Sequence, residues 1–132
     1  CFRAKDHLVT KGDILFNFVQ TKIPPMIYSL LDFSRQSLDD IDYFMFHQTN
    51  KFSLQKLADK LKVSHEKMPY NIVENFGNPS SVSIPMAITY NCGETLKTHS
   101  YLMCCAGFGV GLTWSSMLLN VGNFDFCEFL EC

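Results

Sequence analysis

Apolar side chains recur every three or four positions in the first third of the chain, which is the spacing of an amphipathic helix. This pattern predicts a helix that starts at Ile14, with Asp13 as its N-cap. Pro24 and Pro25 follow, and proline both removes an amide donor and clashes with the preceding turn. We therefore expect the first helix to break or kink there, and a second helix to continue to about Leu31.

The middle of the chain alternates extended and helical patterns. Residues 41–46 form a short apolar run that predicts a buried strand. After this strand, Asn50 is a typical N-cap residue for the next helix, which carries apolar residues at i, i+3, i+4 and i+7. Residues 70–73 are predicted to be extended, and residues 81–91 to form a helix of small and apolar side chains that stops at Gly93.

Two extended patterns near the C-terminus, over 100–106 and 112–121, flank a glycine-rich segment and predict a hairpin. The alternation of strands and helices indicates an α/β fold. Residues 123–132 follow the hairpin as a tail, and the pattern gives this tail no role. We therefore divide the chain into one domain over 1–122 and a tail over 123–132.

Composition narrows the class of protein. With 132 residues and 47% apolar positions, the chain is long enough for one packed domain and too apolar to be disordered. Its formal charge of −2 lacks the basic excess expected of a nucleic-acid-binding protein. No apolar run reaches the roughly 18 residues that a membrane-spanning helix needs. The chain is too long and too rich in core residues to need disulfides, so we expect a reducing, cytoplasmic setting with free thiols. Because the first residue is Cys1 and not Met, we expect a processed chain or a piece of a longer protein.

The cysteines show no disulfide or metal pattern. Cys104 and Cys105 are adjacent inside an apolar strand, where we expect them to be buried as small apolar side chains. No two cysteines have the C-x-x-C spacing and the histidines show no ligand spacing, so we expect no metal and no cofactor. A Cys–His hydrolase remains an alternative because Cys, His and Asn are all present, although no cysteine has the surroundings of an activated thiolate.

Three features have residue types suited to catalysis or ligand binding. His47 follows the strand over 41–46, and functional side chains of α/β proteins gather at such strand ends. Asn78 lies in a tight loop before a helix. The alternating glycines of Gly107-Phe108-Gly109-Val110-Gly111 would allow a ligand to approach the backbone. Each feature also has an ordinary structural explanation, as a loop histidine, a turn asparagine and a hairpin.

The order and spacing of these features carry more information than any one of them. The chain contains, in order, His47-Gln48-Thr49-Asn50, Phe76-Gly77-Asn78-Pro79-Ser80-Ser81 and Gly107-Phe108-Gly109-Val110-Gly111-Leu112-Thr113-Trp114. Together these motifs resemble the C-terminal half of β-ketoacyl-acyl carrier protein synthase III, a condensing enzyme of the thiolase-like superfamily. The resemblance extends from about Gly12 to about Gly122.

The resemblance implies a fold and a reaction. The C-terminal half in this family is a mixed five-stranded sheet with helices on both faces, one of them a buried helix that here would be residues 81–91. The family reaction is a decarboxylating Claisen condensation of an acyl group from acyl-CoA (acyl-coenzyme A) with malonyl-ACP (malonyl-acyl carrier protein). It is an acyltransferase reaction of fatty acid biosynthesis or of related acyl pathways. The resemblance also implies a homodimer in the intact enzyme.

The resemblance also assigns roles to particular residues. His47 matches the family's catalytic histidine and Asn78 its catalytic asparagine, and both would donate hydrogen bonds to the malonyl thioester oxygen as charge develops. The loop that contributes to the oxyanion hole of the acyl-enzyme corresponds to Phe108, Gly109, Val110 and Gly111. The family's nucleophilic cysteine lies in the N-terminal half and has no match here. We therefore expect this chain to be inactive without that half.

The docking residues depart from the family pattern. Family members commonly have an arginine two residues after the motif's asparagine, and Phe52 stands there instead. Asn50 and the neighbouring Lys51 remain as weaker candidates for contacts with coenzyme A or a carrier protein. Lys51 supplies positive charge but lacks the planar guanidinium group with which arginine binds phosphates and carboxylates. A second interpretation is a non-catalytic thiolase-like domain used for binding or assembly. As half of a larger enzyme, the chain would expose an apolar face where its other half packs.

Overall fold

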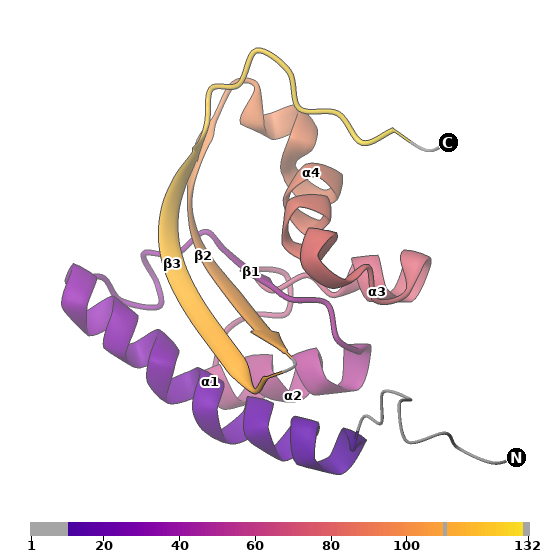
Figure 1. The fold of residues 1–132 in the computed structure, drawn as a ribbon. Helices are drawn as coiled ribbons and strands as arrows, with labels where there is room; N and C mark the ends of the chain where they lie inside the picture. Colours follow the sequence, from indigo (N-terminus) through magenta and orange to yellow (C-terminus); the bar gives the residue numbers. More distant parts are fainter. Residues whose placement is uncertain (1–10, 110, 131–132) are drawn as a thin grey trace, which may run out of the picture.

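The computed structural model describes residues 11–109 and 111–130, which form an α/β domain around a small central sheet (Figure 1). In chain order, its elements are α1 (Gly12–Ser34), β1 (Tyr43–Phe46), α2 (Lys51–Leu61), α3 (Asn71–Phe76), a short 3-10 helix (Ser80–Val82), α4 (Ser83–Leu96), β2 (Ser100–Gly109) and β3 (Thr113–Gly122). This order confirms the α/β class and the C-terminal hairpin that the sequence predicts.

The sheet has three strands in the order β1-β2-β3. β1 is parallel to β2, with Tyr43 opposite Met103, and β2 is antiparallel to β3, with Gly109 opposite Thr113. The sheet is therefore mixed, as expected. The expectation of five strands is wrong for the part of the chain that the structure describes.

The outer edge of β1 shows why the connector beside it is not a further strand. This connector follows α2, and the Phe44 amide donates to the Lys67 carbonyl oxygen at 2.7 Å. Two residues later, Pro69 has no amide hydrogen to continue a ladder. The chain then turns into α3, so the prediction that residues 70–73 are extended is wrong. Ile72 is buried as expected of an apolar residue, but from a helix.

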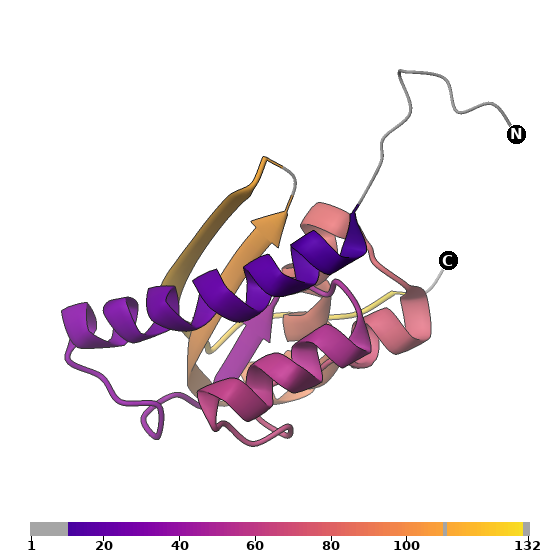
Figure 2. The ribbon, with the colours of Figure 1, turned by 90° about the horizontal axis from the view of Figure 1, so that it is seen from below.

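Helices cover both faces of the sheet. Successive side chains of β1 and β2 point to opposite faces, so they belong to two different cores. On one face, Phe44 and Phe46 pack with α1 and α2, which lie nearest the viewer in Figure 2. On the other face, Met45 packs with apolar residues of α3 and α4. Cys104 and Cys105 are buried in the first and second core respectively, which confirms that they are small core side chains.

α1 is one continuous helix, so the predicted break at Pro24 and Pro25 is wrong. Pro24 leaves the Gln20 carbonyl without the amide donor that a helix normally supplies four residues later. The Lys60 ammonium group takes that place and donates to the Gln20 carbonyl oxygen at 2.7 Å. A side chain from α2 thus satisfies the acceptor that the proline would otherwise leave unpaired.

The helix starts differ in how well the sequence predicts them. The Asn50 side chain accepts a hydrogen bond from the Ser53 amide at 2.8 Å, which confirms Asn50 as the N-cap of α2. Asp13 is not the N-cap of α1, because the helix already begins at Gly12. The Asp13 carboxylate lies instead in the first turn, where negative charge interacts favourably with the helix dipole.

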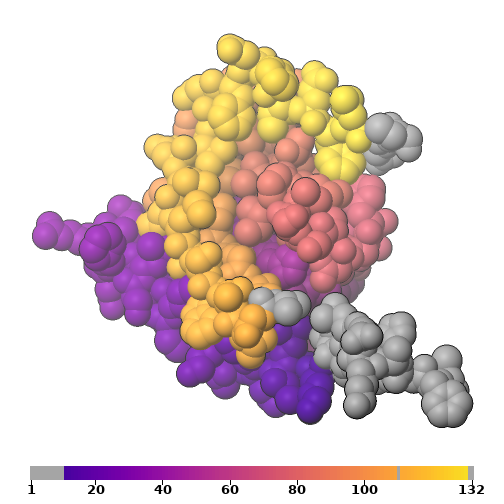
Figure 3. All heavy atoms as spheres, in the orientation of Figure 1, coloured from indigo at the N-terminus to yellow at the C-terminus, as the bar shows by residue number. Residues whose placement is uncertain are grey.

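α4 continues through Gly93, which the sequence predicts as its end. Instead, this glycine allows the backbone of the tail to approach α4 closely. A Cβ atom at Gly93 would lie 2.9 Å from the backbone carbonyl oxygen of Cys127 in the tail. At the end of α4, the Phe124 amide donates to the Leu96 carbonyl oxygen at 3.1 Å. The tail over 123–130 therefore packs on α4, as the space-filling view shows (Figure 3).

Several large apolar side chains remain exposed. On β3, Trp114 on the side of α1 and Met117 and Leu119 on the opposite side are between 39% and 50% exposed. Beside and on α4, Val82 and Tyr90 are also exposed, so the helix expected to be buried is only half covered within this chain. Within residues 11–109 and 111–130, no helix is both long and apolar enough to cross a membrane.

Candidate active site

An open cavity of about 1200 Å³ lies beyond the C-terminal end of β1. It is bordered by the start of α1, the segment between α3 and α4, and the turn between β2 and β3. Among the residues that line it are His47, Asn50, Asn78, Ser83, Phe108, Gly109 and Gly111. The structure therefore brings the three predicted motifs to one place. Of the candidate residues, Val110 lies outside the described part of the chain.

The position of His47 follows from the parallel pairing of β1 with β2. Its backbone amide donates to the Ala106 carbonyl oxygen at 2.9 Å, one residue beyond the end of β1. The imidazole Nδ1 lies 2.7 Å from the Ser83 hydroxyl oxygen at the start of α4. The ring also packs edge-on against Phe108 of β2, with ring centroids 5.7 Å apart. These contacts fix the ring between β2 and α4.

The surroundings of His47 also affect its charge. Burial lowers the pKa of His47 below its usual 6.5, because a less polar environment penalises the imidazolium form, and a hydrogen bond with the Ser80 backbone opposes this shift. The ring is therefore neutral at pH 7. A neutral imidazole has one N–H donor and one acceptor nitrogen. When the Ser83 hydroxyl donates to Nδ1, the ring proton lies on Nε2.

Asn78 lies in a tight loop that follows α3. Gly77 adopts a φ of 76°, a conformation that glycine tolerates without strain and that lets the chain turn sharply. The Asn78 side-chain oxygen then accepts a hydrogen bond from the Ser80 amide at 2.9 Å. This bond orients the carboxamide through its oxygen. The carboxamide nitrogen has no hydrogen-bond partner among the residues that the structure describes, so it is available as a donor.

The β2–β3 turn brings backbone close to the cavity. Phe108 and Gly109 end β2, and Gly111 lies in the turn that follows. A Cβ atom at Gly111 would lie 2.8 Å from the Thr113 side chain and 2.9 Å from its backbone nitrogen, so only glycine fits there. A Cβ atom at Gly109 would meet no atom within 4 Å. The space beside Gly109 is therefore open at the edge of the cavity.

Sequence reasoning missed Gln48, which is fully buried and connects the elements around the cavity. Its side-chain nitrogen donates to the carbonyl oxygens of Phe46 and Pro69, both at 3.0 Å. Its side-chain oxygen accepts from the Val73 amide at 3.4 Å. Gln48 thus joins the strand that precedes His47 to the helix that precedes the Asn78 loop. In the sequence, its only signal is its place beside His47.

Replacing Gln48 with leucine is expected to lower the free energy of unfolding by about 2–3 kcal/mol, because buried carbonyl groups lose their donor. Urea denaturation of this chain measures the change. Gln55→Leu is the matched control, since Gln55 donates a single hydrogen bond at 3.3 Å to the Tyr70 hydroxyl. We expect a loss below about 1 kcal/mol for the control. Equal losses for the two variants would contradict the connecting role of Gln48.

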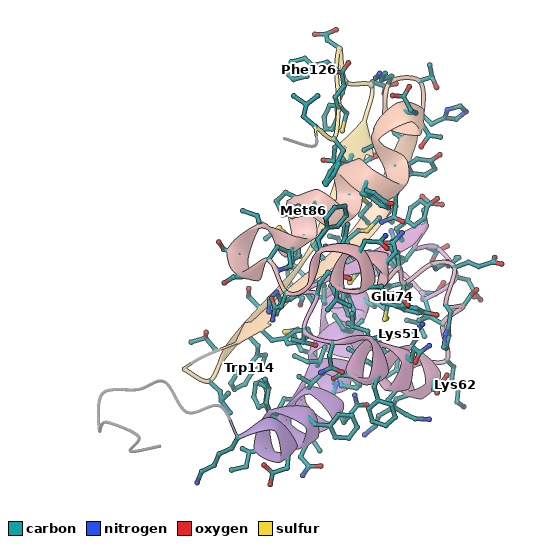
Figure 4. All side chains as sticks on the ribbon, turned by 90° about the vertical axis from the view of Figure 1, so that its right-hand side faces the viewer. Lys51, Lys62, Glu74, Met86, Trp114 and Phe126 are labelled. Atoms are coloured by element: carbon teal, nitrogen blue, oxygen red, sulfur yellow. The ribbon has the colours of Figure 1, made fainter. Side chains whose placement is uncertain are left out.

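The candidate docking residues already have partners within the chain. Lys51 forms an ion pair with Glu74 at 2.5 Å, and the two side chains lie close together in Figure 4. Its ammonium group also lies 5.5 Å from the centre of the Tyr70 ring. The hydrogen bond with Glu74 is the main cause that raises the pKa of Lys51. The Asn50 side chain, as described above, caps α2.

Three of the described cysteines are buried and unsuited to nucleophilic attack. Burial raises the pKa of Cys92 and Cys105 to about 11 and that of Cys104 to about 12. None of the cysteines in the described part of the chain lines the cavity with His47. No observation therefore favours the Cys–His hydrolase. Within the same residues, no group of three or more His, Cys, Asp or Glu side chains is placed to hold a metal ion.

Solved structures that resemble this domain include 3-oxoacyl-(acyl-carrier-protein) synthases. A 3-oxoacyl-(acyl-carrier protein) synthase from Burkholderia xenovorans LB400 is similar, with a TM-score of 0.89 and 35% identity, over 96% of this chain and 36% of that one. A second structure, a 3-oxoacyl-(acyl-carrier-protein) synthase III, has a TM-score of 0.83 and 30% identity, over 89% of this chain and 35% of that one. The domain therefore has a thiolase-like α/β fold.

Sequence comparison identifies the family. The family model described as 3-oxoacyl-[acyl-carrier-protein (ACP)] synthase III C terminal matches residues 31–121. The β-ketoacyl-[acyl-carrier-protein] synthase III of Streptococcus gordonii is 35% identical over 118 residues, which is 87% of this chain and 36% of that protein. The chain therefore belongs to the 3-oxoacyl-[acyl-carrier-protein] synthase III family and matches its C-terminal part. It spans about a third of the length of these relatives.

Proposed function

We propose that this chain supplies the half of a β-ketoacyl-ACP synthase III active site that generates the carbanion. The observation that carries the proposal is that His47, Asn78 and the glycine-rich turn line one cavity. Together with membership of the family, this favours a decarboxylating condensation. The acyl group would come from acyl-CoA and the extender from malonyl-ACP. The reaction would serve fatty acid biosynthesis or a related acyl pathway.

In the decarboxylation step, the bond between the malonyl carboxylate and its neighbouring carbon breaks and CO₂ leaves. The electron pair moves into the thioester and forms an enolate, whose oxygen accepts hydrogen bonds from the His47 ring N–H and the Asn78 carboxamide. In this role Ser83 donates to His47 Nδ1, which places the ring proton on Nε2. Each such donor, held in a site shielded from water, contributes roughly 3 kcal/mol to transition-state stabilisation.

In the condensation step, the enolate carbon forms a bond with the acyl carbonyl carbon, and a cysteine thiolate leaves. The backbone amides of Phe108–Gly111 would stabilise the oxyanion that forms on that carbonyl. Asn50 lines the cavity and Lys51 is the next residue in the chain. Both already form hydrogen bonds within the chain, so we expect them to contribute little to the binding of coenzyme A or the carrier protein. A phosphate or carboxylate that binds Lys51 would share its ammonium group with Glu74.

The cysteine nucleophile would come from an N-terminal half. The exposed apolar side chains of β3 provide a surface that such a half would bury. The complete enzyme would be a homodimer of such two-part chains. Without the other half no acyl-enzyme forms, so this chain alone would be inactive.

A condensation assay with acyl-CoA and malonyl-ACP tests the proposal, first on this chain alone and then on the chain joined to its N-terminal half. We expect product only from the joined protein. Cys105→Ser in the joined protein is the control, and it should remain active because Cys105 is a core side chain. A folded joined protein that binds malonyl-ACP without forming product would instead support a non-catalytic binding module.

A further inference from the structure

The tail over 123–130 lies beyond the family match, which ends at residue 121. After β3 it turns back along α4, as the yellow segment of Figure 1 shows. Cys127 packs against the same core as the apolar side chains of α4, and its backbone occupies the space that a side chain at Gly93 would fill. The described part of the tail is therefore seated on α4.

The tail also contacts the end of α3. The Phe129 ring lies 5.3 Å, between centroids, from both the Phe76 ring and the Tyr90 ring. Phe76 and Tyr90 in turn lie 5.6 Å apart at a steep angle, which completes a three-ring cluster. The Asn75 side chain donates to the Tyr90 hydroxyl at 3.3 Å. One aromatic cluster thus joins the tail, α3 and α4.

This cluster lies directly before the Asn78 loop. Phe76 is the last residue of α3, and only Gly77 separates it from Asn78. A six-residue helix is too short to be stable by itself, so its position depends on contacts with its neighbours. The beginning of α3 is held by the reciprocal Asn71–Asn91 hydrogen bonds at 2.7 and 3.1 Å. Its end is held by the aromatic cluster.

We propose that the tail is a strap that positions the catalytic asparagine, and that Phe129 is its positioning residue. This inference rests on the proposed function for the role of Asn78. Gly77, with a φ of 76°, turns the chain sharply between Phe76 and Asn78, so the position in which α3 ends sets where the loop begins. When the Phe129 ring holds Phe76, the Asn78 carboxamide keeps the orientation that its bond with Ser80 defines.

Amide hydrogen exchange of this chain tests the strap without any substrate. The Ser80 amide reports on the loop, because it donates to the Asn78 side chain. We expect Phe129→Ala to raise its exchange rate about threefold or more, since local opening becomes easier. Phe126→Ala is the matched control: Phe126 lies in the same tail but is 78% exposed, and Figure 4 shows it at the edge of the molecule. We expect no change in the control.

Amides of β2 show whether each variant keeps its fold, because they belong to the central ladder. If Phe129→Ala unfolds the chain, Gly93→Ala decides the question. Its new Cβ would displace the tail at the Cys127 carbonyl while every aromatic ring remains. We expect the same rise in Ser80 exchange for Gly93→Ala. Equal Ser80 exchange in a folded Phe129→Ala and in Phe126→Ala would overturn the proposal.

An activity measurement on the joined enzyme separates positioning from simple stability. Phe129→Ala should lower kcat for condensation by about tenfold and leave acylation by acyl-CoA unchanged, because only the asparagine loop is misplaced. Phe129→Tyr should restore kcat, since it keeps the ring. If the joined enzyme forms no condensation product, the proposed function is contradicted. The exchange measurement still shows whether the tail positions the Asn78 loop. Equal loss of acylation and condensation in Phe129→Ala would contradict a specific positioning role.

Discussion

Replacing His47 with alanine in the joined enzyme is expected to lower the condensation rate by about 10²–10³-fold, because one donor to the developing enolate is lost. Transfer of the acyl group from acyl-CoA to the cysteine should be nearly unchanged, because that step would use the other half of the enzyme. Rapid-mixing kinetics measures the two steps separately. A burst of acyl-enzyme followed by very slow product formation is the expected result.

His65→Ala is the matched control for this prediction. His65 is exposed and lies 2.9 Å from the Asp59 carboxylate, away from the residues that line the cavity. The control should keep a nearly normal rate. A His47→Ala enzyme that condenses within about threefold of the normal rate would contradict a donor role.

The pH dependence of the enzyme should reflect the neutral state of His47. Burial places the folded-state pKa of His47 below 6.5, so at pH values between the two pKa values the unfolded chain binds a proton that the folded chain does not. This contribution to stability is present above pH 6.5 and decreases as pH falls towards the folded-state pKa. The decarboxylation rate should likewise stay constant at neutral pH and fall when the ring becomes protonated. A His47→Gln variant should lose the stability slope.

Replacing Asn78 with aspartate is expected to cost at least about 10²-fold in the condensation rate. The new carboxylate can still accept the hydrogen bond from the Ser80 amide, so the loop keeps its shape. However, the donor group becomes an oxygen, and its negative charge opposes the charge of the enolate. The loss should therefore equal or exceed that of Asn78→Ala. Steady-state rates with malonyl-ACP compare the variants.

Asn75→Asp is the matched control in the same segment. The Asn75 side chain donates to the Tyr90 hydroxyl, and a carboxylate there can accept from that hydroxyl instead. This variant should keep most of its activity. If Asn75→Asp lost as much activity as Asn78→Asp, the effect would be one of loop charge and not of a specific donor.

Local patterns were sufficient to predict much of the fold. The cap at Asn50 depends on hydrogen bonds between residues three positions apart, and the hairpin depends on adjacent strands. The alternation of Phe44, Met45 and Phe46 likewise places side chains in two cores on opposite faces. Each of these features is set by neighbours in sequence, so the sequence contains the necessary information.

Most of the wrong predictions involve contacts between distant segments. α1 continues through two prolines, and Lys60, from another helix, donates to the Gln20 carbonyl that Pro24 leaves without its amide donor. Gly93 lies inside α4 and not at its end, and the lack of a side chain there lets the backbone of the tail pack against the helix. The segment over 70–73 turns into α3 and is not extended, because Pro69 has no amide hydrogen to continue the pairing beside β1. No periodicity in the sequence reports such contacts.

The same distinction applies to the candidate site. The motif order predicts His47 and Asn78, and the structure places both at one cavity. The groups that orient them were not predictable, because Ser83 is 36 residues from His47 and the Gln48 contact with Val73 spans 25 residues. Supporting residues of this kind lack a motif of their own and become visible only when the chain is folded.

The most direct measurement of the central claim is CO₂ release from malonyl-ACP by the joined enzyme after its nucleophilic cysteine has been replaced with alanine. Without that cysteine no acyl-enzyme forms, so CO₂ release reports only on the half of the site in this chain. We expect CO₂ release to persist in this variant and to be lost when His47→Ala or Asn78→Asp is added. Release that both substitutions leave unchanged would contradict the claim that this chain generates the carbanion.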